Sequence, residues 1–234
     1  MRKGLFNWFI PTVRFNLHYF PFRQAVKLPV YVFDARFLVT KGSVTLPQGE
    51  ISRAMIKIGM PETGLCRGRK FTLEIKGKVK FNGPCRLGAG GVLSVGDKGL
   101  AEFGSNVVVS DASKVIAYHY IYFGDNTTAG WECSFCDSDF HAMKNAFTGK
   151  KLKAYAPIKI GHDNWFGCGC HILKGCVTPA YTTISAGSVL TRKYKCEEKS
   201  IISGNPAEVV SEGCFYRDMS DDRFEYKPYE QIPK

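Results

Sequence analysis

The sequence of 234 residues contains no apolar run that approaches the ~20 residues of a membrane-spanning helix. The first eleven residues begin with a charged stretch, but their apolar part is short and lacks a small-residue cleavage site, so we expect no secretory signal peptide. The nine cysteines are an odd number, spread from Cys66 to Cys214. This distribution does not suit the disulfide framework of a small secreted protein, and we expect reduced thiols in a cytoplasmic protein.

Acidic residues are scarce in the first third of the chain. Residues 1–80 hold 15 Lys and Arg against 4 Asp and Glu, whereas residues 81–234 hold 17 of each kind. The net charge of +11 therefore comes from the first third, which suits an anionic partner, although a solvated basic surface explains it equally well. The aromatic and basic stretch 14–23 suits packing against the fold or, as the alternative, peripheral contact with the inner face of a membrane.

A six-residue repeat dominates the middle of the chain. Glycine, at 24 of 234 residues, and aromatics, at 13%, favour turns and strands over long helices. Apolar residues recur in steps of six at Phe103, Val109, Val115 and Ile121; at Phe123, Ala129 and Phe135; and at Ile160, Phe166, Ile172, Ile184 and Leu190, where Thr178 takes the one position that is not apolar. In this last run the residues two positions earlier are mostly small. Residues two apart on a strand point the same way, so both fill the interior. Three such faces make one eighteen-residue coil of a solenoid. The glycines just after four repeat positions are expected to let the backbone turn the corners: Gly104, Gly124, Gly161 and Gly167.

The repeat is interrupted once. His141 occupies a repeat position, and the next one, Ile160, follows nineteen residues later. We therefore expect residues 142–157 to leave the coil as a loop with His141 at its root, and long loops on regular scaffolds are usually functional. Four lysines without an acid between them, Lys144, Lys150, Lys151 and Lys153, suit an acidic acceptor, although the solubility of a mobile loop is the simpler explanation.

Five segments resemble the hexapeptide-repeat acyltransferases, in the branch of sugar O-acetyltransferases and xenobiotic acetyltransferases. They are residues 137–141, 157–167, 172–177, 184–192 and 203–207, in the family's order and with its interval between His141 and Trp165. The resemblance implies an all-β, left-handed parallel β-helix over residues 71–205, with a capping segment at 1–70 and a C-terminal tail at 206–234. It also implies a homotrimer that binds acetyl-coenzyme A between subunits.

The resemblance also implies the roles of individual residues. His141 corresponds to the general base that takes the proton of the acceptor, a task that suits the histidine side chain. Asp139, or alternatively Asp137, is expected to orient the imidazole. The implied cofactor-binding positions are Trp165, Gly167, Ser185, Ala186, Thr191, Arg192 and Lys193, and the expected substrate-binding residues are Asn126, Lys144 and Lys153.

Three residues depart from the family pattern. Glu208 and Ser211 stand where relatives often carry basic residues, so part of the phosphate clamp is missing. Lysines in the short insertion before Ser200 are candidates to replace it: Lys193, Lys195 and Lys199. Lys153 stands where some relatives place a glutamate that supports the histidine.

These observations predict an acetyl-coenzyme A dependent O-acetyltransferase that acts on a sugar hydroxyl of a surface polysaccharide or its precursor. N-acetylation of an amino sugar or a small xenobiotic, and a non-catalytic scaffold, are the alternatives. We expect no metal, because the thiols near His171 point to different sides of the coil: Cys133, Cys136, Cys168 and Cys170. We expect His119 and His162 to have packing roles. The basic segment 64–70 lacks the aromatic residues of a nucleic-acid platform, so no nucleic-acid partner is expected.

Overall fold

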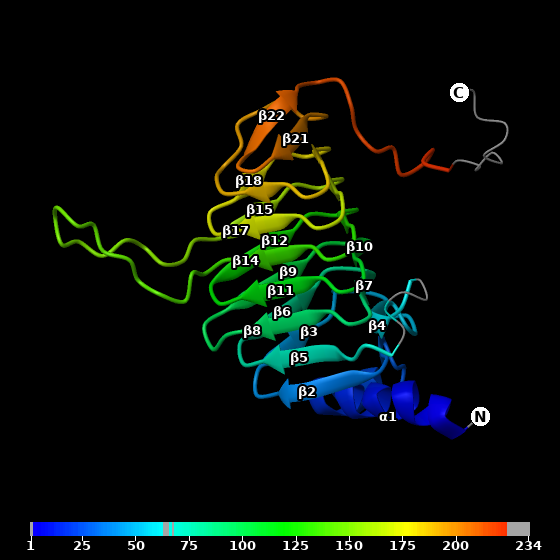
Figure 1. Ribbon diagram of the computed structural model, residues 1–234. Helices are drawn as coiled ribbons and strands as arrows, with labels where there is room; N and C mark the ends of the chain where they lie inside the picture. Colours follow the sequence, from blue (N-terminus) through cyan, green and yellow to red (C-terminus); the bar gives the residue numbers. More distant parts are fainter. Residues whose placement is uncertain (1, 63–65, 67, 224–234) are drawn as a thin grey trace.

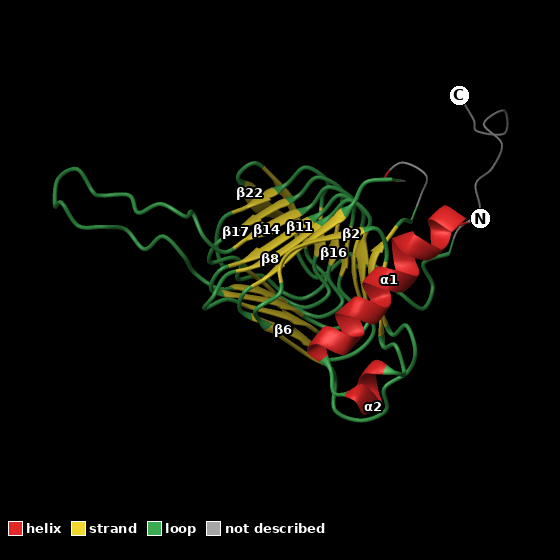
Figure 2. Cartoon of the chain, turned by 90° about the horizontal axis from the view of Figure 1, so that it is seen from below, coloured by secondary structure: helices red, strands yellow, loops and turns green. Residues whose placement is uncertain are grey.

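The computed structural model describes residues 2–62, 66 and 68–223, with side chains from residue 7 onward. The chain winds into a triangular prism whose three faces are parallel β-sheets, which we call sheets A, B and C (Figures 1 and 2). Each coil passes from A to B to C, so the prism has an A/B edge, a B/C edge and a C/A edge. Part of the basic segment 64–70 and the end of the predicted tail, residues 224–234, lie outside the described residues.

Up to β20, each sheet contains every third strand in sequence. In stacking order, sheet A contains β1 (Val30–Val32), β4 (Ile56–Met60), β7 (Cys85–Gly88), β10 (Val107–Val109), β13 (Thr128–Ala129), β16 (Trp165–Phe166), β19 (Thr183–Ile184), β21 (Ile201–Gly204) and the antiparallel β22 (Ala207–Ser211). Sheet B contains β2 (Ala35–Val39), β5 (Phe71–Ile75), β8 (Val92–Val95), β11 (Lys114–Ala117), β14 (Ser134–Cys136), β17 (His171–Leu173) and β20 (Val189–Leu190). Sheet C contains β3 (Ser43–Thr45), β6 (Lys78–Phe81), β9 (Leu100–Phe103), β12 (Tyr120–Phe123), β15 (Ile158–Ile160) and β18 (Val177–Thr178).

The six-residue repeat forms the core, as predicted. The apolar repeat positions are buried, and so are the smaller residues two positions before Ile160 and the repeat positions that follow it. Rings also stack from coil to coil: the centroids of Phe81 and Phe103, and those of Phe103 and Phe123, are each 5.2 Å apart. Because such stacked rings lose almost all contact with water, they contribute strongly to coil-to-coil cohesion.

The coil length is eighteen residues only near the C-terminal end. Asn164 and Thr182 occupy equivalent places 18 residues apart, whereas Asn106 and Asn126 do so 20 residues apart. The expectation of a uniform eighteen-residue coil is therefore wrong for the earlier coils, which have longer corners.

The glycines that follow the repeat positions have a different role from the one predicted. A Cβ on Gly124 would lie 2.4 Å from the backbone nitrogen of His162, one coil away. The left-handed backbone is instead at the corner residues Asn126 (φ 57°) and Asp163 (φ 56°). Glycine is thus required for the close approach of stacked coils, and asparagine or aspartate, which tolerate positive φ better than most residues, make the turn.

The N-terminal cap is shorter than the predicted segment, residues 1–70. Strands β1 to β4 lie within it and already form part of the solenoid. The cap consists of α1 (Arg2–Tyr19) and α2 (Phe22–Ala25), and α1 covers the open edge of sheet A. Asn16 Nδ2 donates to the carbonyl of Val30 at 2.6 Å, and Thr12 Oγ1 accepts from the N–H of Val32 at 2.9 Å. These side chains satisfy β1 backbone groups on the side where no further strand pairs with it.

The C-terminal end is closed by a hairpin. Strand β22 turns back on β21, so ordered sheet continues to Ser211, beyond the predicted boundary at residue 205. All nine cysteines are free thiols, as predicted. Within the described residues, no helix is both long and apolar enough to cross a membrane.

Candidate functional site

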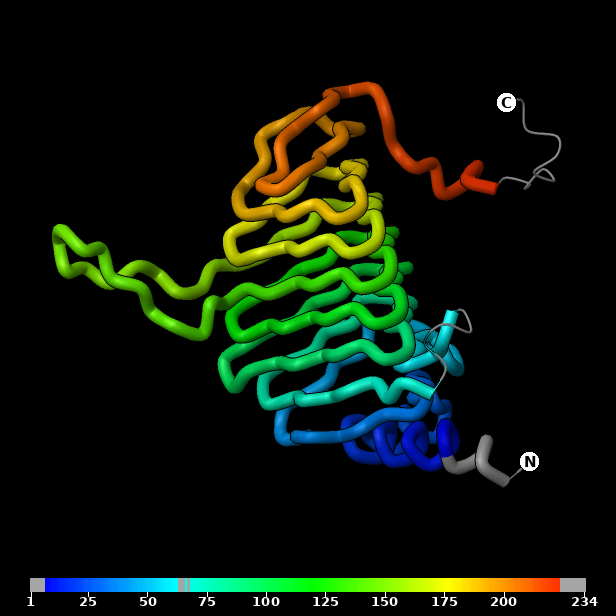
Figure 3. Tube along the Cα trace, viewed as in Figure 1, coloured from blue at the N-terminus to red at the C-terminus, as the bar shows by residue number. Residues whose placement is uncertain are grey.

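A long two-stranded arm, residues 137–157, leaves the prism at the B/C edge between β14 and β15 (Figures 1 and 3). Antiparallel bridges join Ser138 to Tyr155 and Lys144 to Lys151. The excursion begins before the predicted residue 142. His141 therefore lies within the arm, between the two bridges, rather than at its root.

The root of the arm is anchored by Asp137. Its buried carboxylate accepts hydrogen bonds from the backbone N–H groups of Tyr118 and His119, both at 2.8 Å. Burial raises the pKa of Asp137 above the ordinary range for aspartate, although the backbone donors oppose this effect. Asp137 thus anchors the arm to the coil below, and its carboxylate is committed to backbone groups rather than to the imidazole of His141.

We expect Asp137→Ala to lower the free energy of unfolding by about 2–5 kcal/mol, because it leaves two buried N–H groups without an acceptor. A group with a raised pKa in the folded state stabilises most below its unfolded pKa, so the deficit of the variant should shrink as the pH rises from about 4 through the raised pKa. Thermal unfolding followed at several pH values measures both effects. Asp139→Ala, two residues away and exposed, is the matched control; it removes only an exposed ion pair with Lys174, so it should lower the free energy of unfolding by at most ~1 kcal/mol. An equal loss in both variants would contradict the anchoring role.

Lys174, which sequence analysis missed, ties the arm to the next coil. It follows β17 at the B/C edge, where its ammonium pairs with the Asp139 carboxylate and donates to the carbonyl oxygen of Lys153 at 2.9 Å. One cation therefore contacts both strands of the arm. The Asp139 carboxylate, predicted to orient His141, is directed to Lys174 instead.

The His141 side chain is exposed, and no hydrogen bond to its imidazole is formed among the described residues. Two aromatic pairs join the arm to the coil below it: the Phe140 and Tyr118 rings meet edge to face with centroids 4.8 Å apart, and those of Tyr155 and His119 are 4.9 Å apart. Beyond them the arm exposes large apolar side chains, and Phe147 at its tip is 99% exposed. Such a surface is typical of a segment that contacts another molecule.

The predicted cofactor positions fall into two groups. Four lie on sheet A or at the A/B edge: Trp165, Gly167, Ser185 and Ala186. The Trp165 side chain is 42% exposed on the outer face of β16. Gly167 is stacked so closely under Ala186 that a Cβ would lie 2.6 Å from the Ala186 backbone nitrogen. The small residue at position 167 therefore has a packing reason of its own.

The other group, Thr191, Arg192 and Lys193, lies at the B/C edge, two coils beyond the arm. The Arg192 guanidinium pairs with the Glu208 carboxylate on β22 and lies 5.5 Å from the centroid of the Tyr194 ring. A carboxylate thus neutralises the cation predicted to meet the cofactor phosphates.

We expect Glu208→Lys to lower the KM for the predicted cofactor, acetyl-coenzyme A, by about 3–10-fold, because it frees the Arg192 guanidinium and adds a cation beside it. Steady-state kinetics at fixed acceptor concentration and low salt measures the change. Glu212→Lys makes the same charge change at another exposed glutamate. If both variants lower KM equally, general charge rather than release of Arg192 is the cause.

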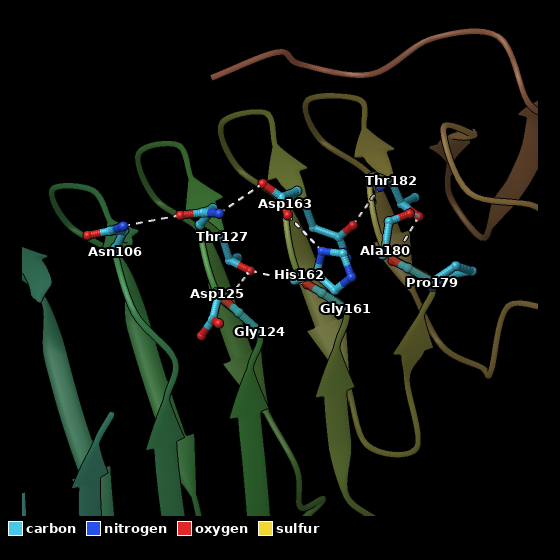
Figure 4. Close-up of polar contacts among 12 residues, drawn as sticks. Asn106, Gly124, Asp125, Thr127, Gly161, His162, Asp163, Pro179, Ala180 and Thr182 are labelled. Carbon is cyan, nitrogen blue, oxygen red and sulfur yellow. Dashed lines mark hydrogen bonds and ion pairs between the residues drawn. The ribbon is translucent and has the colours of Figure 1, made fainter. Parts of the chain in front are cut away.

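Asn126, predicted to bind substrate, lies at the C/A edge, away from the arm. It donates to Asp163 Oδ1 at 3.0 Å and accepts from Asn106 at 3.2 Å, so the three corner residues form a polar ladder. Figure 4 labels the two ends of this ladder, Asn106 and Asp163. Next to it, His162 Nδ1 lies 2.7 Å from Asp163 Oδ2. His162 thus has the carboxylate partner that was expected for His141, although the sequence predicted a packing role for it.

One chain does not bring all of the predicted site residues together. The B/C edge holds His141, Asp139, Lys144 and Lys153 on the arm, with Arg192 and Lys193 two coils further on. Trp165, Gly167, Ser185 and Ala186 belong to sheet A and the A/B edge, and Asn126 belongs to the C/A edge. A site that uses the first two groups requires the arm of one chain to meet the A/B edge of another.

Solved structures share this architecture, although no family model and no curated protein matches the sequence. The polysialic acid O-acetyltransferase OatWY superposes with a TM-score of 0.54 at 17% identity, covering 86% of this chain and 94% of that chain. The polysialic acid-specific acetyltransferase NeuO gives a TM-score of 0.51 at 16% identity, covering 82% and 91% respectively. The fold is a left-handed parallel β-helix. This confirms the fold class predicted from the repeat and the resemblance.

Proposed function

We propose that the protein is an acetyl-coenzyme A dependent O-acetyltransferase that acts on a sugar hydroxyl of a surface polysaccharide or its precursor. The observation that carries the proposal is the arm, which holds an exposed His141 and four lysines out from a β-helix. The same fold in two polysialic acid acetyltransferases supports it. The order and spacing of the motifs around His141 and Trp165 support it further.

The proposed active unit is a homotrimer in which the arm of one subunit lies against the A/B edge of the next. The separation of the two residue groups on one chain supports this arrangement, as do the apolar side chains exposed along the arm. Subunits related by a threefold axis meet through two different surfaces. The arm at the B/C edge of one subunit and the A/B edge of the next are two such surfaces.

In this site His141 takes the proton from the acceptor hydroxyl, because a neutral alcohol is a poor nucleophile. Acetyl-coenzyme A supplies the activated acetyl group as a thioester. Trp165 forms one wall of the channel for the pantetheine arm, and the backbone beside Gly167 and Ala186 forms its floor. Asp139 acts through Lys174 as a positioning residue, since this pair fixes the arm that carries the base.

The lysines of the arm favour an acceptor that carries a carboxylate or phosphate. Lys144, Lys150, Lys151 and Lys153 are exposed, and no acidic residue lies between them. Lys144 and Lys153 flank His141 on the two strands of the arm, which places both cations near the proposed base. Such charges raise the local concentration of an anionic acceptor.

Incubation of the purified protein with acetyl-coenzyme A and a panel of acidic and neutral oligosaccharides and sugar nucleotides tests the proposal. We expect release of coenzyme A thiol that depends on an acidic acceptor, and a product that carries one hydroxylamine-sensitive acetyl ester by mass spectrometry. A hydroxylamine-resistant amide would assign N-acetylation instead. Absence of thiol release with every acceptor, together with no effect of coenzyme A on thermal stability, would favour a scaffold.

A further inference from the structure

Helix α1 is apolar on both of its sides. The side that faces the solenoid buries Phe15 at 1% exposure and Asn16 at 0%. At 3.6 residues per turn, Ile10, Arg14 and Leu17 fall on the opposite side of the helix. The exposed fractions of Ile10 and Leu17 are 49% and 55%. A helix that only caps a solenoid needs a polar outer side, so this apolar outer side requires another explanation.

The apolar area continues past the end of α1. Helix α2 packs inward through Ala25, which is 1% exposed, and leaves Phe22 74% exposed and Val26 55% exposed. Figure 2, which views the molecule from below, shows both helices across the N-terminal end of the prism. We call the outer residues of these helices the cap surface: Ile10, Arg14, Leu17, Phe22, Arg23, Val26 and Lys27.

The cap surface is positively charged. Arg14, Arg23 and Lys27 are exposed and form no ion pair among the described residues. The sequence contains no acidic residue before Asp34. Apolar and cationic side chains therefore share one face without a compensating negative charge, a combination that fits an anionic amphiphilic surface.

The orientation of α1 suits a planar partner. The helix runs across the end of the prism, roughly perpendicular to the direction in which the coils stack (Figure 1). Its outer side thus faces away from every coil. End-to-end association with a second copy is disfavoured, because it would bring the same uncompensated cations together.

We propose that the cap surface binds the surface of an anionic phospholipid bilayer. Leu17 and Phe22 enter the interface between headgroups and acyl chains, while Arg14, Arg23 and Lys27 contact lipid phosphates. The arm leaves the prism sideways, several coils away, so it stays clear of the bilayer while the cap is bound (Figure 1). The proposal is independent of the transferase activity.

Cosedimentation of the full chain with vesicles of phosphatidylcholine alone, or mixed with phosphatidylglycerol, tests the proposal. We expect binding to the mixed vesicles only, weakened by salt. Replacement of Arg14, Arg23 and Lys27 by Gln should weaken binding on the order of 100-fold, since each juxtamembrane cation contributes about fivefold. The double variant Leu17→Ser with Phe22→Ser should weaken it at least ~10-fold.

The control variants change exposed residues elsewhere. Gln in place of Lys98, Lys114 and Lys159 removes the same charge from the sides of the prism, and Leu173→Ser with Val210→Ser removes two other exposed apolar side chains. Both controls should bind vesicles like the wild type. The proposal is overturned if the mixed vesicles do not bind the chain or if cap and control variants lose binding equally. It is also overturned if sedimentation velocity shows that the cap mediates end-to-end association instead. Circular dichroism identifies any variant that fails to fold. If one of the two cap variants does not fold, the comparison of the other cap variant with its control decides the test.

Discussion

We expect the replacement of His141 by alanine to lower kcat/KM for the proposed acetyl transfer by about 10²–10⁴-fold, the range for loss of a general base. The expected effect falls mainly on kcat, because the imidazole acts on the reacting hydroxyl and the proposed cofactor channel is formed by other residues. Stability should be unchanged, since the side chain is exposed on the arm. Thiol release at saturating acetyl-coenzyme A, together with thermal unfolding, measures both quantities.

His162→Ala is the matched control for this result. His162 is also exposed, and it is the histidine with a carboxylate partner, 2.7 Å away on Asp163. If the loss of activity follows His162 and His141→Ala remains active, the base is on the C/A edge and the assignment to the arm is wrong. Loss in both variants with unchanged unfolding would mean that the two edges contribute to one site.

A mixture of two inactive variants should regain activity. If the site joins His141 of one subunit to Trp165 of the next, then trimers that combine His141→Ala chains with Trp165→Ala chains contain intact sites. If equal amounts of the two chains assemble at random, about one site in four receives both intact residues. Co-expressed chains should therefore reach about one quarter of the wild-type rate.

Two different affinity tags allow the mixed trimers to be isolated, and simple mixing of the preassembled variants is the control. Preassembled variants should stay inactive until the subunits exchange. A site built within one chain gives no recovery under either condition, because each chain then lacks one of its two residues. A mixed complex without activity would therefore contradict the shared site while leaving the oligomer itself established.

The solenoid was predictable because its core repeats in the sequence. Each coil places equivalent residues at the same position, so the apolar residues recur every six positions, and one period determines many contacts at once. The first coils could not be predicted in this way, because their longer corners change the spacing between equivalent residues and interrupt the six-residue repeat. The strands β1 to β4 thus lie in a segment predicted to be a cap.

The contacts of the arm were less predictable, since they depend on residues far apart in the sequence. His141 and the excursion were evident as an interruption in the repeat, but nothing in the local pattern indicates that Lys174 reaches Asp139, 35 residues away. Likewise, the sequence marks Glu208 only as a departure from the family pattern and gives no sign that it pairs with Arg192. Sequence spacing identifies the position of a side chain on a coil, whereas its partner depends on which corners become neighbours.

The arm interrupts the chain without disturbing the sheets around it. Phe135, before it, pairs with Ile172 of the next coil, and Ile160, after it, pairs with Phe123 of the preceding one, as in an uninterrupted helix. An insertion here costs mainly loop-closure entropy, which grows slowly with length. An arm of another length or sequence could therefore leave this edge without changing the pairing of β14 with β17 or of β15 with β12.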